Sequence, residues 1–379
     1  MKSRADRILI GGFVAVLFSM SLLFVILPYR SFSEVENRPL QHIPQLSWAN
    51  IWSKTFSEET ENFITDHFPL RTEWVWAKSV MEQLRLQQEN NGVYKGKDGY
   101  LFEKFAEPSY KQVQQYTEAV KQFAQAHPEV DMTFLLAPTS SGMYPEKMPW
   151  LAPIYSQAKV NAFIAEQLKG SLSFMNGFDT LSSHVAEQLY YRTDHHWTTH
   201  GAYLAYAAYA RKMGWKPLAE SDFTITTVTD SFLGSYHTKS QFAGLKPDSI
   251  QAYIPKNPVD TSLYIADTNQ TFASLYDFSF LAKKDKYSYF LGGVHALMKI
   301  TSKLDPQTVK QEKLLVIKDS YAHSFIPFLT LHVPEIDVID IRYYNGSISK
   351  YMLENGITKV LFLFNTTTFI DNNAIMKLS

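Results

Sequence analysis

Three histidines and an aspartate crowd into the segment 193–200, which reads TDHHWTTH. Asp194 and His196 lie two residues apart just before a predicted helix, so on an extended segment both side chains project to the same side. A carboxylate placed there can hold one imidazole nitrogen and leave the other free as a base. The spacing predicts an acid–base pair, although a structural hydrogen bond closing a helix entrance would use the same two residues.

A second polar group follows the apolar run 313–317, which is predicted to be a strand and ends in Lys318-Asp319-Ser320 before a helix. The Ser320 hydroxyl then lies at a strand-to-helix turn, where outward backbone N–H groups can stabilise an oxyanion. A serine is a weak nucleophile unless an imidazole activates it. Ser320, His196 and Asp194 are therefore a candidate triad for acyl-ester chemistry, while a helix N-cap is the simpler interpretation of Ser320 alone.

The same histidine-rich segment allows a metal-binding interpretation. Asp194, His195, His196 and His200 carry the carboxylate and imidazole groups that suit a divalent ion such as zinc. However, no second carboxylate stands at ligand spacing, and His196 and His200 straddle the predicted helix start. We expect neither a metal nor another cofactor.

Three further groups are weaker candidates. Gly293, in a Gly-Gly pair after an expected strand, can supply an oxyanion donor, but paired glycines more often form a simple turn. Asp340 and Arg342 can orient substrate, although a structural ion pair explains them as well. Asp66 and His67 form another Asp–His pair, which lies too close to the N-terminal stalk for us to place it in the site.

The elements that must position these residues show an α/β rhythm. Helices are predicted at 110–126, 158–169, 181–190 and 199–213, and strands at 130–137, 172–178, 287–291, 313–317, 336–341 and 359–364. The last three strands are short apolar runs typical of strands buried on both faces. We therefore expect an α/β sandwich with a mostly parallel sheet and a site at the carboxyl ends of its strands.

The segments outside this alternation have other compositions. Residues 50–88 have helical periodicity interrupted by Pro69, which predicts two helices, and 93–102 form a hairpin-like piece around Lys97-Asp98-Gly99. Residues 214–284 are rich in Thr, Ser and Asp and are predicted to be an insertion or lid.

The N-terminal segment is apolar enough to cross a membrane. Residues 8–27 are uncharged and, as a helix, cover the roughly 30 Å core of a bilayer. Lys2, Arg4 and Arg7 precede it against one acid, Asp6, a bias that predicts a cytoplasmic N-terminus and an exported remainder. A cleaved signal peptide, with a poor site at 31–33, is the alternative, and it would export the domain too.

These observations divide the chain into a cytoplasmic tail (1–7), a transmembrane anchor (8–28), a stalk with N-terminal helices (29–88) and an α/β domain (89–379). Composition limits the function further. The 379 residues carry a net charge of −1, which gives no basic field for nucleic acid, and no cysteine, which excludes disulfides and a thiol nucleophile. Aromatic residues make up 15% of the chain, a surplus that suits sugar-like ligands.

The run 191–203, YRTDHHWTTHGAY, resembles the signature of the DHHW protein family, exported proteins related to the alginate O-acetyltransferase accessory proteins and more distantly to SGNH hydrolases. Further support comes from the segments 33–40, 66–71, 232–236, 319–321 and 339–342. The resemblance implies an SGNH-hydrolase-like three-layer sandwich. It places the family's Asp-x-His pair on Asp194 and His196, and its serine on Ser320.

Two residues depart from the pattern of the broader SGNH group. Lys318 stands where a Gly-Asp-Ser loop would have Gly, and Val294 follows Gly293 where an oxyanion Asn would be expected. These departures leave the donors of the oxyanion hole unassigned. The candidates for oxyanion or substrate binding are Tyr321, Gly293, Arg342 and Tyr236.

Together, the triad and the resemblance predict a serine O-acyltransferase or esterase, with acetyl as the expected acyl group. The resemblance implies that it modifies a cell-surface polysaccharide outside the cytoplasm and receives the acyl group through a membrane-bound O-acyltransferase. The alternative is a non-catalytic glycan-binding or scaffolding protein of the envelope, which would keep the fold without the chemistry.

Overall fold

The computed structural model of the chain describes residues 4–33, 35–36, 38–307 and 312–378. The chain forms two compact units: unit 1 comprises 1–87 with 241–243, and unit 2 comprises 88–240 with 244–379. Lys2 of the predicted tail, and Glu34 and Asn37 of the segment 33–40, lie outside the described residues.

Unit 1 is built from helices and one short strand pair. Its elements are α1 (Arg4–Ile26), β1 (Phe32–Ser33), β2 (Arg38–Pro39), α2 (Trp48–Trp52), α3 (Thr55–Asp66) and α4 (Arg71–Leu84). Three helices thus occupy the region where two were predicted. The predicted break at Pro69 is confirmed, because this residue lies between α3 and α4 and disfavours helical backbone at Phe68 before it.

Helix α1 alone, among the described residues, is long and apolar enough to cross a membrane. Its 23 residues have a mean hydropathy of 2.6 over the most apolar stretch, and none of them is buried. Such a helix near the N-terminus is consistent with a single-pass anchor or with a signal sequence.

Unit 2 contains an eight-stranded sheet in the order β11-β10-β12-β14-β13-β15-β6-β7. The strands are β6 (Asp131–Ala137), β7 (Ser173–Asn176), β10 (Thr261–Ile265), β11 (Gln270–Phe272), β12 (Leu297–Ser302), β13 (Lys313–Lys318), β14 (Glu335–Ile339) and β15 (Lys359–Asn365). The five strands from β14 to β7 are parallel, and β12, β10 and β11 extend the sheet antiparallel. The predicted mostly parallel sheet is confirmed.

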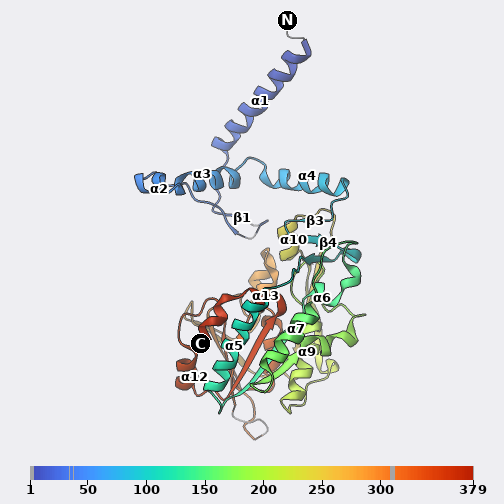
Figure 1. Cartoon of the computed structure of the whole chain (residues 1–379), viewed down its shortest axis with the longest axis vertical. Helices are drawn as coiled ribbons and strands as arrows, with labels where there is room; N and C mark the ends of the chain where they lie inside the picture. The colour runs from blue at the N-terminus through green and yellow to red at the C-terminus, as the bar shows by residue number, and fades with distance from the viewer. Residues whose placement is uncertain (1–3, 34, 37, 308–311, 379) are drawn as a thin grey trace. The chain divides into compact units, whose positions relative to one another are not determined.

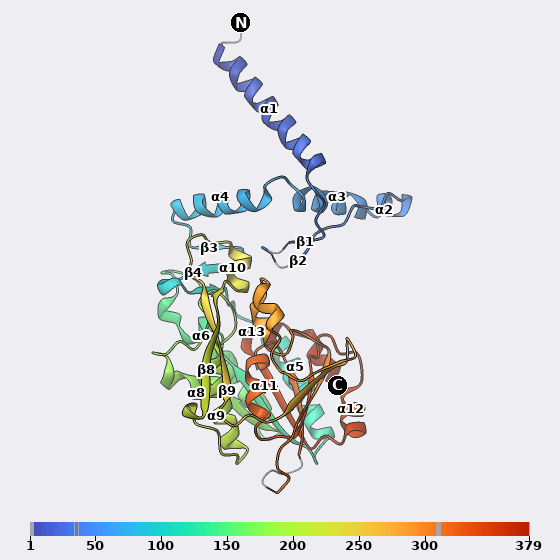
Figure 2. The ribbon, with the colours of Figure 1, turned by 180° about the vertical axis from the view of Figure 1, so that it is seen from behind.

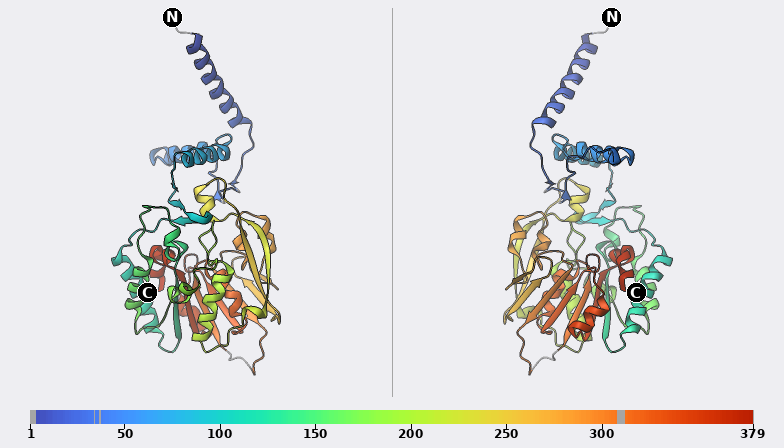
Figure 3. Two further views of the ribbon diagram at one scale, coloured as in Figure 1. Left: turned by 90° about the vertical axis from the view of Figure 1, so that its right-hand side faces the viewer. Right: turned by 90° about the vertical axis from the view of Figure 1, so that its left-hand side faces the viewer.

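Helices cover both faces of this sheet (Figures 1, 2 and 3). One face packs against α5 (Tyr110–Ala126), α7 (Gln157–Leu168), α12 (Ile348–Asn355) and α13 (Thr366–Asp371). The other packs against α8 (Gly177–Leu181), α9 (Thr199–Lys212) and α11 (Ala322–Leu329). Apolar residues recurring every three or four positions, such as Val113, Tyr116 and Val120 of α5, supply the buried stripes. Unit 2 is therefore a three-layer α/β sandwich.

Two small sheets and a short helix complete unit 2. β3 (Glu89–Asn90), β4 (Val93–Lys95) and β5 (Leu101–Glu103) form one sheet, with the predicted turn 97–99 between β4 and β5. β8 (Phe223–Phe232) pairs antiparallel with β9 (Asp248–Pro255), and α10 (Ser235–Ser240) follows β8.

Two predicted elements are wrong. The helix expected at 181–190 stops after α8 and a 3-10 turn at Ser182–His184, since the N–H of Leu189 donates to Tyr144 Oη and to the Glu187 carbonyl instead of continuing a helical ladder. The strand expected at 287–291 is largely a 3-10 helix, Lys286–Tyr289. Conversely, β12 was not expected, and β10 and β11, within the segment 214–284, belong to the main sheet.

Candidate active site

The structure brings Asp194, His196 and Ser320 together at the carboxyl end of β13. His196 Nδ1 lies 2.5 Å from Asp194 Oδ1, and His196 Nε2 lies 2.7 Å from Ser320 Oγ. Asp194 and His196 are buried, whereas Ser320 is partly exposed. A carboxylate, an imidazole and a solvent-reachable hydroxyl thus form a continuous hydrogen-bonded chain, the geometry that a serine nucleophile requires.

The Asp194 carboxylate is held by backbone donors from two segments. Oδ1 accepts the His196 N–H at 3.0 Å, and Oδ2 accepts the Ser235 N–H at 2.7 Å. Gly234 makes this approach possible, because a Cβ at that position would overlap the Asp194 side chain. Burial raises the pKa of Asp194, but His196, His195 and these donors lower it by more, so its pKa lies well below the ordinary range. Asp194 therefore stays ionised.

The His196 ring is also held from its face. Tyr287 stacks on it with ring centroids 3.6 Å apart and planes 11° apart. The Tyr287 hydroxyl in turn hydrogen-bonds Ser324 Oγ at 3.0 Å and donates to the Ser320 carbonyl at 3.3 Å. Tyr287 thus fixes the imidazole plane and ties it to the start of α11.

The turn that presents Ser320 is organised by Asp319. Its carboxylate accepts the Tyr321 N–H at 2.9 Å, and both the backbone N–H and the Nδ2 of Asn365 at 2.8 Å. Burial raises the pKa of Asp319 above its ordinary value, and these donors oppose the rise. Because Asn365 ends β15, two neighbouring parallel strands jointly hold the turn.

Two aromatic side chains join the histidine segment to this turn. Trp197 Nε1 donates to the Tyr321 carbonyl at 2.9 Å and to Ser324 Oγ at 3.1 Å. The Tyr321 hydroxyl donates to the His195 carbonyl at 2.5 Å. These reciprocal bonds connect segments more than 120 residues apart and set the Ser320–His196 distance.

Lys318, the residue that departs from the SGNH pattern, lies in a buried network beside the turn. Its Nζ donates to Asp340 Oδ2 at 3.0 Å and to His323 Nε2 at 2.8 Å. The Arg342 guanidinium donates two hydrogen bonds to the Asp340 carboxylate, of 2.8 and 2.6 Å. Burial lowers the pKa of Lys318, which Asp340 partly restores, and burial with Lys318 lowers the pKa of His323. This network supports the turn that carries Ser320, because Lys318 and His323 lie on either side of it in the sequence.

The four residues proposed for oxyanion or substrate binding all lie in internal contacts. The N–H of Tyr321 is used by Asp319, that of Gly293 by the Phe290 carbonyl, and the guanidinium of Arg342 by Asp340. Tyr236 is buried, with its ring centroid 6.1 Å from that of His195. Within the part of the chain that the structure describes, none of the four hydrogen-bonds to Ser320 Oγ, so their roles stay predictions.

A metal ion would compete with these contacts. Asp194, His195 and His196 offer ligand atoms within 4.8 Å of one another, whereas His200 does not belong to this group. Both nitrogens of His196 already bind triad partners, and His195 Nδ1 binds Ser235 Oγ at 2.6 Å. His200 instead contacts Glu187, Glu220 and Tyr253. The arrangement favours the triad over a metal centre.

A polar cleft of about 560 Å³ lies between the histidine segment, the start of α9 and the β8–β9 hairpin. Its lining includes amide, carboxylate, guanidinium and tyrosine side chains: Glu187, Gln188, Tyr191, Arg192, Glu220, Gln251 and Tyr253. The buried Tyr191 hydroxyl has no hydrogen-bond partner among the described residues. These groups are the kind that hydrogen-bond to sugars.

Three residues of this site were not predicted: Gly234, Tyr287 and Asn365. Gly234 belongs to the segment 232–236 that supported the family resemblance, so a signal existed for it. Tyr287 was predicted to be in a strand, and Asn365 follows an apolar run without any further motif. Their positions depend on contacts between distant segments.

The fold and the site together define a three-layer α/β domain with an Asp–His–Ser arrangement at the carboxyl end of its parallel strands. Residues 154–339 match the family model described as DHHW protein, and the resemblance to this family is confirmed. Among curated protein sequences, none matches the chain.

Two of the solved structures that match the chain share its fold, each with a TM-score of 0.66. A DHHW family protein from Eubacterium siraeum is 25% identical, with a TM-score of 0.66 over 76% of this chain and 95% of that one. PatB1 of Bacillus cereus is 20% identical, with a TM-score of 0.66 over 76% of this chain and 99% of that one. The O-acetyltransferase domain of AlgJ from Pseudomonas putida is 15% identical, with a TM-score of 0.46 over 76% and 98%.

Proposed function

We propose that this protein is a serine O-acyltransferase or esterase that modifies a cell-surface polysaccharide outside the cytoplasm, with acetyl as the transferred group. One observation carries the proposal: the hydrogen-bonded chain from Asp194 through His196 to Ser320. The DHHW resemblance and the apolar helix α1 agree with such a role at the cell envelope.

In the first half of the reaction, Ser320 Oγ attacks the carbonyl carbon of the acyl donor while His196 Nε2 takes its proton. Asp194 keeps the ring in the tautomer that has Nε2 free and balances the imidazolium. The tetrahedral intermediate then expels the donor's alkoxide, which receives the proton from His196. The acyl group remains as an ester on Ser320.

In the second half, His196 removes a proton from a hydroxyl group, whose oxygen attacks the acyl carbon. Ser320 Oγ leaves and recovers that proton from His196. A sugar hydroxyl as attacker makes the protein a transferase, and water makes it an esterase. The triad geometry serves both reactions.

The oxyanion needs donors that the fold has not already used. Among the described residues, the backbone N–H of Ser320 has no backbone acceptor, and it lies at the turn before α11. An N–H so placed can bind the developing oxyanion, as the sequence position predicts.

Hydrolysis of p-nitrophenyl acetate by the full chain in detergent micelles tests the proposal. We expect turnover that Ser320→Ala and His196→Ala each lower by at least about 10³-fold. We also expect phenylmethylsulfonyl fluoride to add one adduct, found by mass spectrometry on the peptide containing Ser320. Chelator should leave the rate unchanged.

Ser349→Ala serves as the matched control, because Ser349 lies on α12 and its hydroxyl contacts His127 rather than the triad. Equal rates in Ser320→Ala and the unaltered chain, with equal folding by circular dichroism, would contradict the proposal and favour a binding protein. Loss of activity in chelator would favour a metal-dependent hydrolase.

The polar cleft is our proposed binding place for the polysaccharide acceptor, because its lining residues Arg192 and Thr198 flank the segment that carries Asp194 and His196. Gln251→Ala removes an exposed amide from the lining. We expect it to raise the KM for a glycan acceptor several-fold and to leave p-nitrophenyl acetate hydrolysis unchanged. An unchanged KM would exclude Gln251 from acceptor binding.

A further inference from the structure

Helices α2, α3 and α4 of unit 1 expose an unusual amount of aromatic and aliphatic surface. Across all three helices only Ser79 is buried. Four of the chain's seven tryptophans lie here and are more than half exposed: Trp48, Trp52, Trp74 and Trp76. Helices in water normally bury such side chains, so this surface needs a covering partner.

Four exposed apolar residues of α4 and its N-cap form one stripe, whereas Trp76 lies on another side of the helix. Leu70, Trp74, Met81 and Leu84 recur at spacings of four, seven and three residues, which places them on one side of the helix. Their exposed fractions run from 51% to 72%. An amphipathic helix whose apolar side is open is typical of helices that lie in a membrane interface.

Contacts with α1 place α3 at the level where the apolar helix ends. Phe24, in the last turn of α1, meets Phe63 of α3 edge to face with ring centroids 6.1 Å apart. Just after α1, Tyr29 stacks on His67 with centroids 5.0 Å apart. If α1 crosses a bilayer, Phe63 lies at the boundary between its acyl chains and headgroups.

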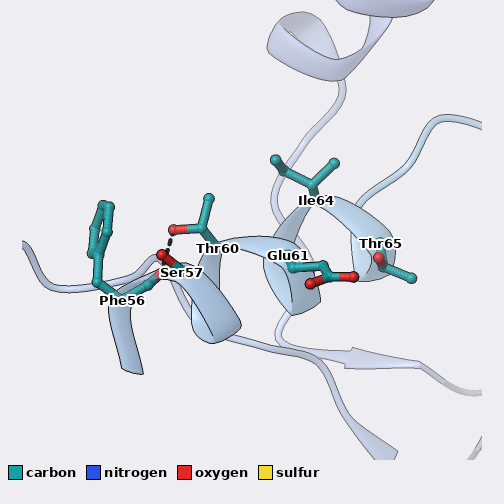
Figure 4. Close-up of a pocket in the computed structure, with 6 residues that line it drawn as sticks. All are labelled: Phe56, Ser57, Thr60, Glu61, Ile64 and Thr65. Atoms are coloured by element: carbon teal, nitrogen blue, oxygen red, sulfur yellow. Dashed lines mark hydrogen bonds between the residues drawn. The ribbon is translucent and has the colours of Figure 1, made fainter. Parts of the chain in front are cut away.

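The side of α3 that carries Phe63 is itself apolar and hollowed. Figure 4 shows Phe56, Thr60 and Ile64 projecting from one side of the helix, and helical spacing places Phe63 beside them. They line a shallow groove of about 400 Å³ together with Ser57, Glu61 and Thr65.

The charge of this region indicates how it would bind. Residues 48–87 carry four Lys or Arg side chains against six Asp or Glu side chains, a net charge of −2. Attraction to anionic lipid headgroups therefore cannot hold it on a membrane. Aromatic and aliphatic burial must do so, as it does for tryptophans in membrane interfaces.

We propose that α2, α3 and α4 form an interfacial platform, which lies in the headgroup layer of the membrane that α1 crosses. Phe56 and Ile64 of α3 and the α4 stripe enter the lipid, while the acidic side chains remain in water. The occupant of the surface is thus phospholipid. The inference is independent of the triad, since no residue of the platform takes part in the proposed chemistry.

The absence of cysteine makes a direct test possible in the full chain. Single-cysteine variants Ile64→Cys, Trp74→Cys and Leu84→Cys are labelled with an environment-sensitive fluorophore and reconstituted in phosphatidylcholine vesicles. We expect blue-shifted emission, and quenching by lipids with a nitroxide about 5–10 Å below the headgroups that is at least about twofold stronger than for water-exposed labels.

The matched controls lie on other sides of the same helices, at the exposed residues Glu58 and Thr72. Labels at Glu58→Cys and Thr72→Cys should show little lipid quenching, and labels at the apolar positions should keep theirs in high salt. Equal quenching at both sets of positions, or none at the apolar set, would overturn the proposal and point to a protein partner. Ser320→Ala should not change any of these values.

Discussion

Each unit contains an Asp and a His that lie within two residues of each other in the sequence, Asp66 with His67 and Asp194 with His196, and these two pairs have different partners. In unit 1, Arg38 and the Gln41 N–H hold Asp66, and both nitrogens of His67 contact backbone carbonyl oxygens, those of Phe63 and Arg30. In unit 2, one nitrogen of His196 meets Asp194 and the other meets the Ser320 hydroxyl. Only the second pair has a nitrogen directed at a reactive group.

This difference teaches that residue type and spacing do not suffice to define a site. The Arg38 hydrogen bond lowers the pKa of Asp66. Burial raises the pKa of Asp194, but the neighbouring His196 and His195 lower it by more. Both carboxylates are therefore ionised at neutral pH. What separates the two pairs is a third partner. Only His196 meets a hydroxyl group, that of Ser320 in the turn after β13.

The largest effect is expected when each aspartate in turn is replaced by asparagine. Asp194→Asn should lower kcat for p-nitrophenyl acetate by about 10³–10⁴-fold, because an amide no longer selects the tautomer or balances the imidazolium. Asp66→Asn should leave kcat unchanged while weakening the bond to Arg38. Similar losses in both variants would show that the pairs are not functionally distinct.

The second test moves the carboxylate without removing it. Gly234→Ala places a methyl group where the Asp194 side chain lies, so Asp194 must shift, and we expect kcat to fall by about 10²-fold. Ser235→Ala keeps the backbone N–H that Asp194 accepts and should cost much less. A Gly234→Ala enzyme as active as the unaltered chain would refute this role of the glycine.

A third test removes the ring that holds His196. Tyr287→Leu should lower kcat about tenfold, because the imidazole loses its stacked neighbour and gains freedom to rotate. Tyr287→Phe retains the ring and loses only the hydroxyl bonds, so its kcat should fall less. The ratio of the two rates measures how much orientation by stacking contributes, and equal rates would assign the effect to the hydroxyl.

The smallest expected effect concerns stability. Burial lowers the pKa of both His237 and His332 to about 4, below their ordinary value near 6.5. Each histidine, buried in its neutral form, contributes its full stabilisation of the folded state above pH 6.5. This stabilisation is lost as the pH falls toward 4, because the unfolded chain then binds the proton more readily. Thermal unfolding should therefore shift down by several degrees between pH 6.5 and 4. In His332→Gln, the unfolding temperature should depend less on pH over this range. An unchanged pH dependence would contradict the role assigned to His332.

Much of the α/β framework could be predicted from the sequence. The helix at 110–126 and the strands at 130–137, 313–317 and 359–364 agree with α5, β6, β13 and β15 to within a residue or two, because strict periodicity or continuous apolar runs mark them. The helix expected at 181–190 is wrong because its apolar residues Leu181 and Leu189 are both buried at helical spacing, but Leu181 ends α8 and Leu189 lies in irregular backbone.

The site could be predicted only in part. Local motifs marked Asp194, His196 and Ser320, and the structure brings these three residues together. Tyr287 and Asn365 were not predicted, since their roles arise from contacts with segments 33 or more residues away in the sequence, which no local pattern records. The catalytic roles themselves stay predictions until turnover is measured.

The hold of Asn365 on Asp319 has a consequence for how the protein matures. The acid–base segment is synthesised more than 120 residues before the serine, and β15, which steadies the serine turn, comes about 40 residues later still. Because domains are made from the N-terminus onward, a ribosome-bound or prematurely terminated chain would lack the hydrogen bonds from Asn365 that hold this turn. Reactivity toward esters would then arise only after β15 has been synthesised and has paired with β13.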